Sequence, residues 1–327
     1  MISKVRNRLD VLWALSRDVS GITGIPRWKV ALDVVESRLL WGASEDDYRF
    51  FRFYLLDRQA KGTYLTGHLN RKLISKYNKK EFIPYFEDKG LFAKTFGEFL
   101  GRDWITLKDL DARKLERFVK GKDKVIYKPL TSYRSYGTEK LELTAFDDAN
   151  SLHRYLRKKY GNDGILEDWV DQHPSVSELY PQAVNPIRLI TILDNGECNM
   201  ITSTISVGYG GDIANYYRGS LIAPIDLRTG KITSPAQVKS GELYAEHPIT
   251  GTRIVGFEVP YWREILEMIE RAARVVPEIA YVGWDVAVTP SGPVILEGNH
   301  NPGYHTQQMP AHLVNGVGRR VLYERFL

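Results

Sequence analysis

The sequence predicts an α+β protein with a mostly helical N-terminal region. Up to about residue 120 the apolar residues recur at helical spacing, whereas from residue 185 onward short apolar runs typical of strands dominate. The chain has 327 residues, of which 43% are apolar and 26% charged, and this composition excludes a disordered or collagen-like chain. At this length we expect two or three lobes, each around a sizeable core.

The first segment predicts an amphipathic helix. Its apolar residues at helical spacing are Ile2, Val5, Leu9, Leu12 and Trp13. Two interpretations of this stripe stay open: it packs into the fold, or it makes a peripheral contact with a membrane surface or a partner. The segment lacks the continuous apolar core and cleavage site of a signal peptide, and no part of the chain is apolar enough for a membrane span.

The remaining elements follow from local patterns. Ser44 to Asp47 predicts a capping box that opens a helix, and residues 106–119 predict a helix closed by Gly121. Two further helices are predicted at 147–160 and 261–276. Predicted strands cover 124–129, 138–143, 164–167, 188–193, 198–207, 220–225, 280–288 and 293–297.

Charge is unevenly distributed. Residues 1–130 hold 27 Lys and Arg against 17 Asp and Glu, whereas residues 131–327 hold 18 against 23. The basic part indicates an anionic partner, but no zinc-finger, RNP or basic-zipper motif accompanies it, so we expect no nucleic acid. Cys198, the single cysteine, excludes an internal disulfide and fits a reducing compartment, so we expect a cytoplasmic location. No pattern predicts an oligomeric state.

The segment GWDVAVTPSGPVILEGN, residues 283–299, carries the strongest chemical signal. Its Thr-Pro-Ser-Gly-Pro centre predicts the turn of a β-hairpin. If the turn centres on Ser291, Asp285 lies opposite Glu297, and Asn299 points to the same face as Glu297. Facing carboxylates destabilise a sheet unless a cation lies between them, and their oxygens suit Mg²⁺. The alternative is two surface acids paired with neighbouring Arg or Lys.

Three weaker signals precede this hairpin. Lys128 ends a strand before a small polar loop through Ser135 to Gly137, and these groups could surround phosphate oxygens. Glu167 ends an apolar strand whose backbone could meet a purine edge. Arg188 lies within an apolar strand and suits a phosphate in a polar cleft. The alternatives are a solvent-facing lysine, an ordinary buried strand and a buried salt bridge.

Together these segments resemble an ATP-grasp enzyme. More closely, residues 94–303 resemble the sugar-transfer-associated ATP-grasp family, through NPIRLIT (185–191), HPITG (247–251), GWDVAVTPSGP (283–293) and LEGNHNPG (296–303). The resemblance implies two α+β lobes that grip ATP. We therefore expect a helical region over 1–92, a small lobe with phosphate loop and hinge over 93–170, and a large lobe with metal and acceptor sites over 171–327.

The resemblance also implies roles for individual residues. Lys94 and Lys128 would hold the ATP phosphates under the loop of Ser135 and Gly137, and Glu167, Asp168 and Val170 would meet the adenine. Arg188 would stabilise the transferring phosphoryl group, while Asp285, Glu297 and Asn299 would bind Mg²⁺. On the acceptor side, where the sequence departs from its relatives, the candidates are Asn215, Arg218, His247, His300 and Asn301.

The predicted activity is that of an ATP-dependent carboxylate–amine ligase. It would form an amide, or an ester, through an acyl phosphate, joining an amino acid or other carboxylate to a sugar-type or small-metabolite acceptor with an amine or hydroxyl group. Paired lysines, an arginine and Mg²⁺ suit phosphoryl transfer, which needs positioning and charge neutralisation. Two alternatives stay open: a kinase on the same scaffold, and a nucleotide-binding scaffold without turnover.

Overall fold

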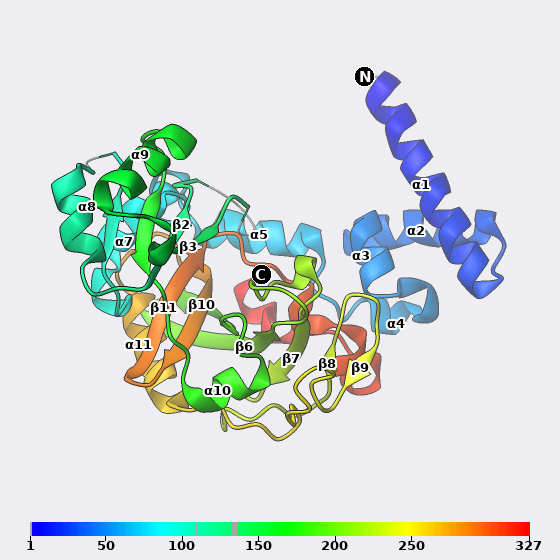
Figure 1. Ribbon diagram of the computed structural model, residues 1–327. Helices are drawn as coiled ribbons and strands as arrows, with labels where there is room; N and C mark the ends of the chain where they lie inside the picture. Colours follow the sequence, from blue (N-terminus) through cyan, green and yellow to red (C-terminus); the bar gives the residue numbers. More distant parts are fainter. Residues whose placement is uncertain (1, 109, 132–135) are drawn as a thin grey trace. The chain divides into compact units, whose positions relative to one another are not determined.

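The computed structural model describes residues 2–108, 110–131 and 136–327 (Figure 1). Within it the chain forms two compact units. One unit comprises Met1–Tyr77 and Gly303–Leu327, and the other comprises Asn78–Pro302. We describe each unit by itself. Ser135, assigned above to a phosphate loop, lies outside the described residues.

The first unit is helical. Its helices are α1 (Ile2–Thr23), α2 (Arg27–Trp41), α3 (Glu45–Phe50), α4 (Arg58–Lys61) and α5 (Gly67–Tyr77), and the returning C-terminal segment adds short 3₁₀ turns. Apolar residues of α1, α2 and α3 form its core together with Phe53 and Tyr64. The predicted capping box is present, because Ser44 Oγ accepts from Asp47 N at 3.1 Å and Asp47 Oδ2 accepts from Ser44 N at 2.8 Å.

The predicted stripe of α1 is only partly buried. Leu12 packs against the core, and the buried face continues through Leu15 and Val19. Leu9 and Trp13, assigned to the same stripe, are each 50% exposed. The packed face of α1 is therefore rotated away from the predicted one.

The second unit contains two antiparallel sheets. The smaller has the order β1-β4-β2-β3, formed by β1 (Trp104–Thr106), β2 (Lys124–Lys128), β3 (Glu139–Glu142) and β4 (Ile165–Asp168). Helices α8 (Ala112–Val119) and α9 (Ala149–Tyr160) pack their leucines against it (Figure 1). The helix predicted from residue 106 is wrong at its start, because 104–106 pair as a strand and Asp111 caps α8.

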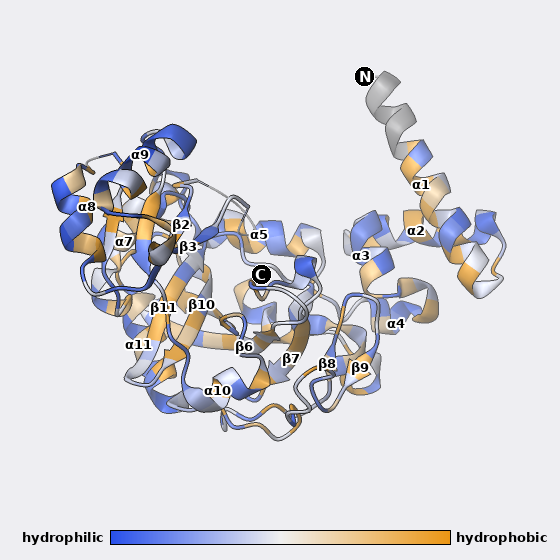
Figure 2. Cartoon of the chain, viewed as in Figure 1, coloured by the Kyte–Doolittle hydropathy of each residue, from blue (hydrophilic) through white to orange (hydrophobic). Residues whose placement is uncertain are grey.

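The larger sheet has the order β11-β10-β5-β6-β7-β8-β9. Its strands are β5 (Ile187–Asp194), β6 (Glu197–Val207), β7 (Leu221–Ile225), β8 (Ala236–Gln237), β9 (Leu243–Tyr244), β10 (Tyr281–Thr289) and β11 (Gly292–Asn299). Its core includes apolar residues of β5, β10 and α11 (Trp262–Ala272). Figure 2 shows hydrophobic residues along β10, in agreement with the burial of almost the whole strand.

Three short helices complete the second unit: α6 (Pro84–Glu87), α7 (Lys89–Thr95) and α10 (Pro174–Leu179). Phe86 of α6 and Phe96 after α7 pack around Trp284 of β10, whose indole N–H donates to Thr191 Oγ1 at 3.0 Å. These contacts hold α6 and α7 beside the larger sheet. Among the described helices of both units, none combines the length and apolarity that crossing a bilayer requires.

Candidate functional site

The predicted pairing of Asp285 with Glu297 is present, but the turn differs. Thr289 pairs with Gly292, so only Pro290 and Ser291 form the turn. With this turn alone, Leu296 and not Glu297 would lie opposite Asp285. A β-bulge restores the expected register, because Val286 pairs with Ile295 and Asp285 with Glu297, leaving Leu296 as the extra residue. The bulge therefore determines that Glu297 faces Asp285.

Arg188 lies opposite Asp285 on the other neighbouring strand. Its guanidinium donates two hydrogen bonds to the Asp285 carboxylate. Nε donates to Oδ1, and Nη2 donates to Oδ2 at 2.6 Å. Burial and Glu297 nevertheless raise the pKa of Asp285 to about 7, against the opposing effect of Arg188. The positive charge of one arginine thus does not fully neutralise the two carboxylates.

Glu297 is the more acidic member of this pair. Partial desolvation raises its pKa, although the residue as a whole is exposed, but Arg188, the hydrogen bond with Asp285 and the charges of Lys128 and Lys89 together hold the pKa below the ordinary value. Asn299 lies next to Glu297, and its Nδ2 donates to Glu297 Oε1 at 3.3 Å. The predicted set of Asp285, Glu297 and Asn299 is therefore gathered on one face of the larger sheet, on the neighbouring strands β10 and β11.

Lys128 and Glu167 meet on the smaller sheet. The ammonium of Lys128 donates to Glu167 Oε2 at 2.8 Å, and Arg102 Nε donates to the same oxygen at 2.8 Å. Burial raises the pKa of Glu167, but the two cations overcome it and hold the pKa at about 2. The Glu167 carboxylate is thus ionised and occupied by two cations of the protein.

Arg102 joins the two sheets. Besides Glu167, its guanidinium donates to the carbonyl oxygens of Leu100 at 3.1 Å, Ile295 at 2.7 Å and Leu296 at 3.2 Å. Its side chain is only 3% exposed. The sequence interpretation missed this residue, because a single arginine between two predicted elements carries no local pattern.

Lys89 interacts electrostatically with the carboxylates of the site. Burial and the charge of Lys128 lower the pKa of Lys89, whereas the charges of Glu297, Glu167 and Asp163 oppose this shift. Lys94 lies five residues further along α7, about 140° around the helix, and is exposed. Lys89 is also held in place by its backbone N–H, which donates to Leu130 O at 3.0 Å.

The other nucleotide-side candidates lie around the smaller sheet. Asp168 accepts from Asp103 N at 3.0 Å and forms an ion pair with Lys122 at 2.6 Å, so its carboxylate fastens β4 to its neighbours. Val170 follows β4 and is half-buried. Gly137 has a φ of 76° and is exposed, and this left-handed conformation favours glycine there.

The acceptor candidates are scattered. His247 is buried, with Nε2 against Gly208 O at 2.7 Å and Nδ1 accepting from Thr250 N at 3.2 Å, so both ring nitrogens are engaged within the protein. Asn215 Oδ1 caps the turn at Tyr217, accepting from its N–H at 2.9 Å, and Arg218 is exposed. The structure brings neither His247 nor Asn215 to the carboxylate pair through a contact.

His300 and Asn301 directly follow the carboxylate strand. His300 Nε2 lies 3.1 Å from Glu87 Oε1, and its backbone oxygen accepts from Asn78 Nδ2 at 2.6 Å. Its Nδ1 is buried and has no hydrogen-bond partner among the described residues. Among the acceptor candidates, His300 therefore has a ring nitrogen without a hydrogen-bond partner in the described part of the chain. Asn301 is exposed.

The donor set fits a magnesium ion by its chemistry. Two carboxylates and an amide oxygen are hard ligands, and the raised pKa of Asp285 indicates that the pair would gain from a further cation. No cluster of three or more His, Cys, Asp or Glu suitable for a metal occurs in the described part of the chain. A metal here would therefore depend on Asp285, Glu297, Asn299 and oxygens from a bound substrate.

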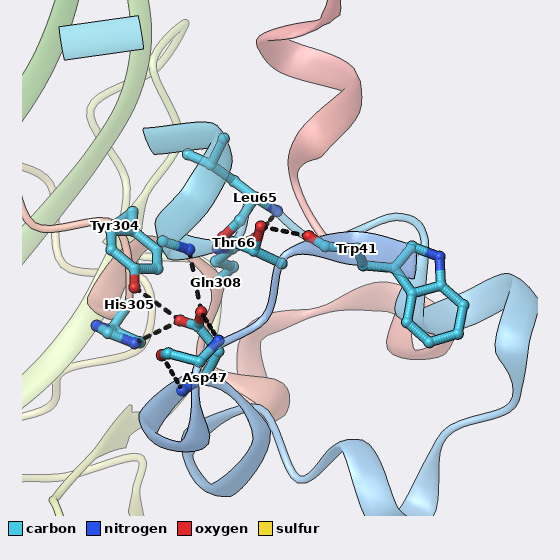
Figure 3. Close-up of polar contacts among 9 residues, drawn as sticks. Trp41, Asp47, Leu65, Thr66, Tyr304, His305 and Gln308 are labelled. Carbon is cyan, nitrogen blue, oxygen red and sulfur yellow. Dashed lines mark hydrogen bonds and ion pairs between the residues drawn. The ribbon is translucent and has the colours of Figure 1, made fainter. Parts of the chain in front are cut away.

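A second polar cluster lies in the helical unit and was also missed (Figure 3). The buried carboxylate of Asp47 accepts from Gly67 N at 3.0 Å and Tyr304 Oη at 2.7 Å, and it contacts His305 Nε2 at 3.0 Å. Gln308 exchanges two hydrogen bonds with the backbone of Leu65, at 2.7 and 3.1 Å. These bonds fasten the returning C-terminal segment to the N-terminal helices of the same unit.

The second unit is thus an α+β fold with a carboxylate pair on the larger sheet, where Arg188 of the same sheet binds Asp285, and with Lys128 and Arg102 bound to Glu167 on the smaller sheet. This arrangement defines a protein suited to a polyphosphate and a divalent cation. A family described as sugar-transfer associated ATP-grasp matches residues 155–319. The chain belongs to this family, which confirms the resemblance drawn from the sequence and, with it, the ATP-grasp fold class.

Solved structures with similarity to the chain include two ligases and a synthetase. The ATP-grasp ligase PsnB with a minimal precursor is 16% identical, with a TM-score of 0.42 over 70% of this chain and 57% of that one. D-cycloserine synthetase DcsG is 10% identical, with a TM-score of 0.45 over 77% and 74%. The L-amino acid ligase from Bacillus licheniformis is 12% identical, with a TM-score of 0.42 over 73% and 47%.

The family match, and not these distant similarities, carries the assignment. This chain spans about 57% of the length of the PsnB chain. No curated protein matches the sequence.

Proposed function

We propose that the chain is an ATP-dependent carboxylate–amine ligase that uses Mg²⁺. The observation that carries this proposal is the Asp285–Glu297 pair, which lies on one face of the larger sheet with Arg188 bound to it and with the charges of Lys128 and Lys89 acting on Glu297. Membership of an ATP-grasp family supports ATP as the phosphoryl donor. A cytoplasmic location would supply that ATP.

The cations have distinct roles in this proposal. Lys128 and Lys89 would bind the phosphate oxygens of ATP, because both ammonium groups lie on the carboxylate side of the smaller sheet. Glu167 orients Lys128 by accepting its hydrogen bond, and the backbone from Asp168 to Val170 would meet the adenine. Lys94 would take part only if the phosphate tail extended over the exposed side of α7.

Arg188 would stabilise the phosphoryl group during transfer. In the structure its guanidinium is bound to Asp285, which fixes its orientation toward the sheet edge. Asp285, Glu297 and Asn299 would hold Mg²⁺, which when bound neutralises charge on the phosphate oxygens. The remaining catalysis is positioning and charge compensation by this chain's own residues.

The reaction has two steps. An oxygen of the substrate carboxylate attacks the γ-phosphorus, the bond between that phosphorus and the β–γ bridging oxygen breaks, and ADP leaves with the bonding electrons. The acceptor amine then attacks the acyl carbon, phosphate leaves, and the nitrogen loses a proton to solvent. A hydroxyl acceptor gives an ester instead. The family description supports a sugar-type or small-metabolite acceptor, and His300 Nδ1 is the atom proposed to contact it.

Trapping with hydroxylamine tests the proposal. The full chain is incubated with ATP, Mg²⁺, a panel of carboxylates including amino acids, and hydroxylamine as a small amine. A hydroxamate together with an equal amount of ADP supports the ligase. A stable phosphoester without hydroxamate indicates a kinase, and ATP binding without ADP release over the whole panel indicates a scaffold; either result overturns the proposal.

A further inference from the structure

Helix α2 has two apolar faces, and only one of them is packed. Val30 and Val34 are buried in the core of the helical unit. On the opposite face lies the α2 stripe, which we define as Trp28, Leu32, Val35 and Leu39, exposed by 57, 62, 41 and 78%. These residues follow the spacing i, i+4, i+7 and i+11, so they form one continuous line along the helix.

Exposed apolar side chains are concentrated in this part of the molecule. Leu9 and Trp13 of α1 are each 50% exposed, and Ile22 at the end of α1 is 75% exposed. Single exposed apolar residues are normal on a protein surface, but a line of four that includes a tryptophan is typical of a docking face. The question is which kind of partner covers it.

The charges around the α2 stripe favour an anionic partner. The two acids of α2 face cations of the same unit: Asp33 bonds to Lys61, and Glu36 bonds to Arg58. On either side of Trp28, Arg27 and Lys29 are exposed, and Lys29 Nζ lies 5.5 Å from the centre of the Trp28 ring. The local surface is therefore apolar with a cationic border.

A cationic border beside an apolar line with tryptophan is the combination that lies in the interface of an anionic bilayer. Tryptophan prefers the headgroup level, and Lys and Arg reach lipid phosphates while their aliphatic stems stay near the acyl chains.

A second copy of the chain fits this face less well. The 15 residues of α2 span about 22 Å, and a stripe roughly 10 Å wide offers on the order of 200 Å², whereas stable complexes bury about 800 Å² per partner. Parallel pairing of two stripes would also bring Arg27 and Lys29 of both copies together. A lipid surface has neither difficulty.

From these observations we propose that the α2 stripe docks the protein on an anionic lipid surface, with α2 lying in the plane of the interface. This proposal does not rest on the ligase activity, because the residues proposed for that activity all lie in the second unit. It also assigns to α2 the peripheral membrane contact that the sequence left open for the first helix. The apolar residues that carry it are those of the α2 stripe, and α1 contributes its exposed Leu9 and Trp13.

Vesicle flotation of the full chain tests the proposal. The lipids are phosphatidylcholine alone and phosphatidylcholine with phosphatidylglycerol. We expect flotation with the anionic vesicles, weaker flotation in high salt, and little with phosphatidylcholine alone. The double variant Leu32→Glu/Leu39→Glu should weaken anionic-vesicle binding at least about tenfold, because it places two anions in the stripe.

Two comparisons make the test decisive. Leu55 and Val314 belong to the same unit and are 64 and 79% exposed, so Leu55→Glu/Val314→Glu is the matched control and should float like the native chain. Circular dichroism checks that each variant is folded. Failure of the native chain to float, or equal flotation of both double variants, overturns the proposal. So does a native dimer, seen by light scattering, that Leu32→Glu/Leu39→Glu dissociates.

Discussion

The carbonyl oxygen of Leu296, the extra residue of the β11 bulge, accepts a hydrogen bond from the guanidinium of Arg102 at 3.2 Å. The same guanidinium binds the Glu167 carboxylate, which in turn holds Lys128. The lysine proposed to bind phosphate and the strand that carries Glu297 are therefore connected through two side chains, Glu167 and Arg102. A change at Arg102 should therefore affect both the position of Lys128 and the position of β11.

Arg102→Lys should lower the rate of ADP formation clearly and should change the free energy of unfolding only slightly. Lysine keeps the positive charge beside Glu167, but it lacks the planar fork that also reaches the Ile295 and Leu296 carbonyls. Arg102→Met leaves the buried Glu167 with one partner fewer and should cost about 3 kcal/mol of unfolding free energy. Steady-state ADP release and urea unfolding measure the two effects. Arg117→Lys, on the exposed face of α8, is the control. Equal rates for Arg102→Lys and the native chain would contradict the connection.

Asp285→Asn and Glu297→Gln should each lower Mg²⁺-dependent ADP release at least about a hundredfold. Both substitutions keep the side-chain shape and remove the charge that a metal needs. Glu258→Gln, whose exposed side chain pairs with Lys231 in the same unit, should have no effect. Isothermal titration with Mg²⁺ and a non-hydrolysable ATP analogue provides a readout that does not depend on turnover. A folded Glu297→Gln variant with near-native turnover would remove the metal assignment.

Lys89→Met and Lys94→Met separate the two lysines of α7. Lys89 is close to Glu297 and Lys128, so its loss should raise the KM for ATP at least about tenfold, as expected for one charge-assisted contact. Lys94 is exposed on another side of the helix, and Lys94→Met should leave the KM unchanged. The reverse ranking would restore Lys94 to the role that the sequence resemblance implied.

Asp47 should make the stability of the helical unit sensitive to acid. Burial raises the pKa of Asp47, but His305, the N–H groups of Ser44 and Gly67, and Tyr304 lower it overall. A depressed carboxylate pKa stabilises the fold above the unfolded value of about 4, and this contribution is lost as the pH falls through the folded pKa. Asp47→Asn should therefore cost about 2 kcal/mol at neutral pH and progressively less in acid. Urea unfolding at several pH values measures the difference, and a constant difference would contradict this assignment.

Local patterns predicted most elements of the second unit because each strand carries its own alternation or apolar run. The hairpin pairing of Asp285 with Glu297 was predicted correctly with an incorrect turn. A two-residue turn and a one-residue bulge together give the pairing that a turn centred on Ser291 would give. The three residues of β1 were too few to show a period, and their partner strand lies about 60 residues further along the chain.

The residues missed in the site depend on distant partners. Arg102 is 65 residues from Glu167 and 193 from Ile295 along the chain, so no local window contains the interaction. Lys89 and Lys94 lie on the same short helix, and only packing decides which faces the carboxylates. His247 was a plausible polar candidate, and its burial against the Gly208 carbonyl becomes visible only in the fold.

The bulge also determines where this hairpin tolerates a change in length. Residues inserted or deleted in the Pro290–Ser291 turn lengthen or shorten a loop and leave the paired positions beyond it in place. Loss of Leu296 would remove the bulge, and Glu297 would stay opposite Asp285 because the ladder would continue directly from the Val286–Ile295 pair. Natural length variation is therefore expected at the tip and at Leu296, the two places where the carboxylates keep their pairing.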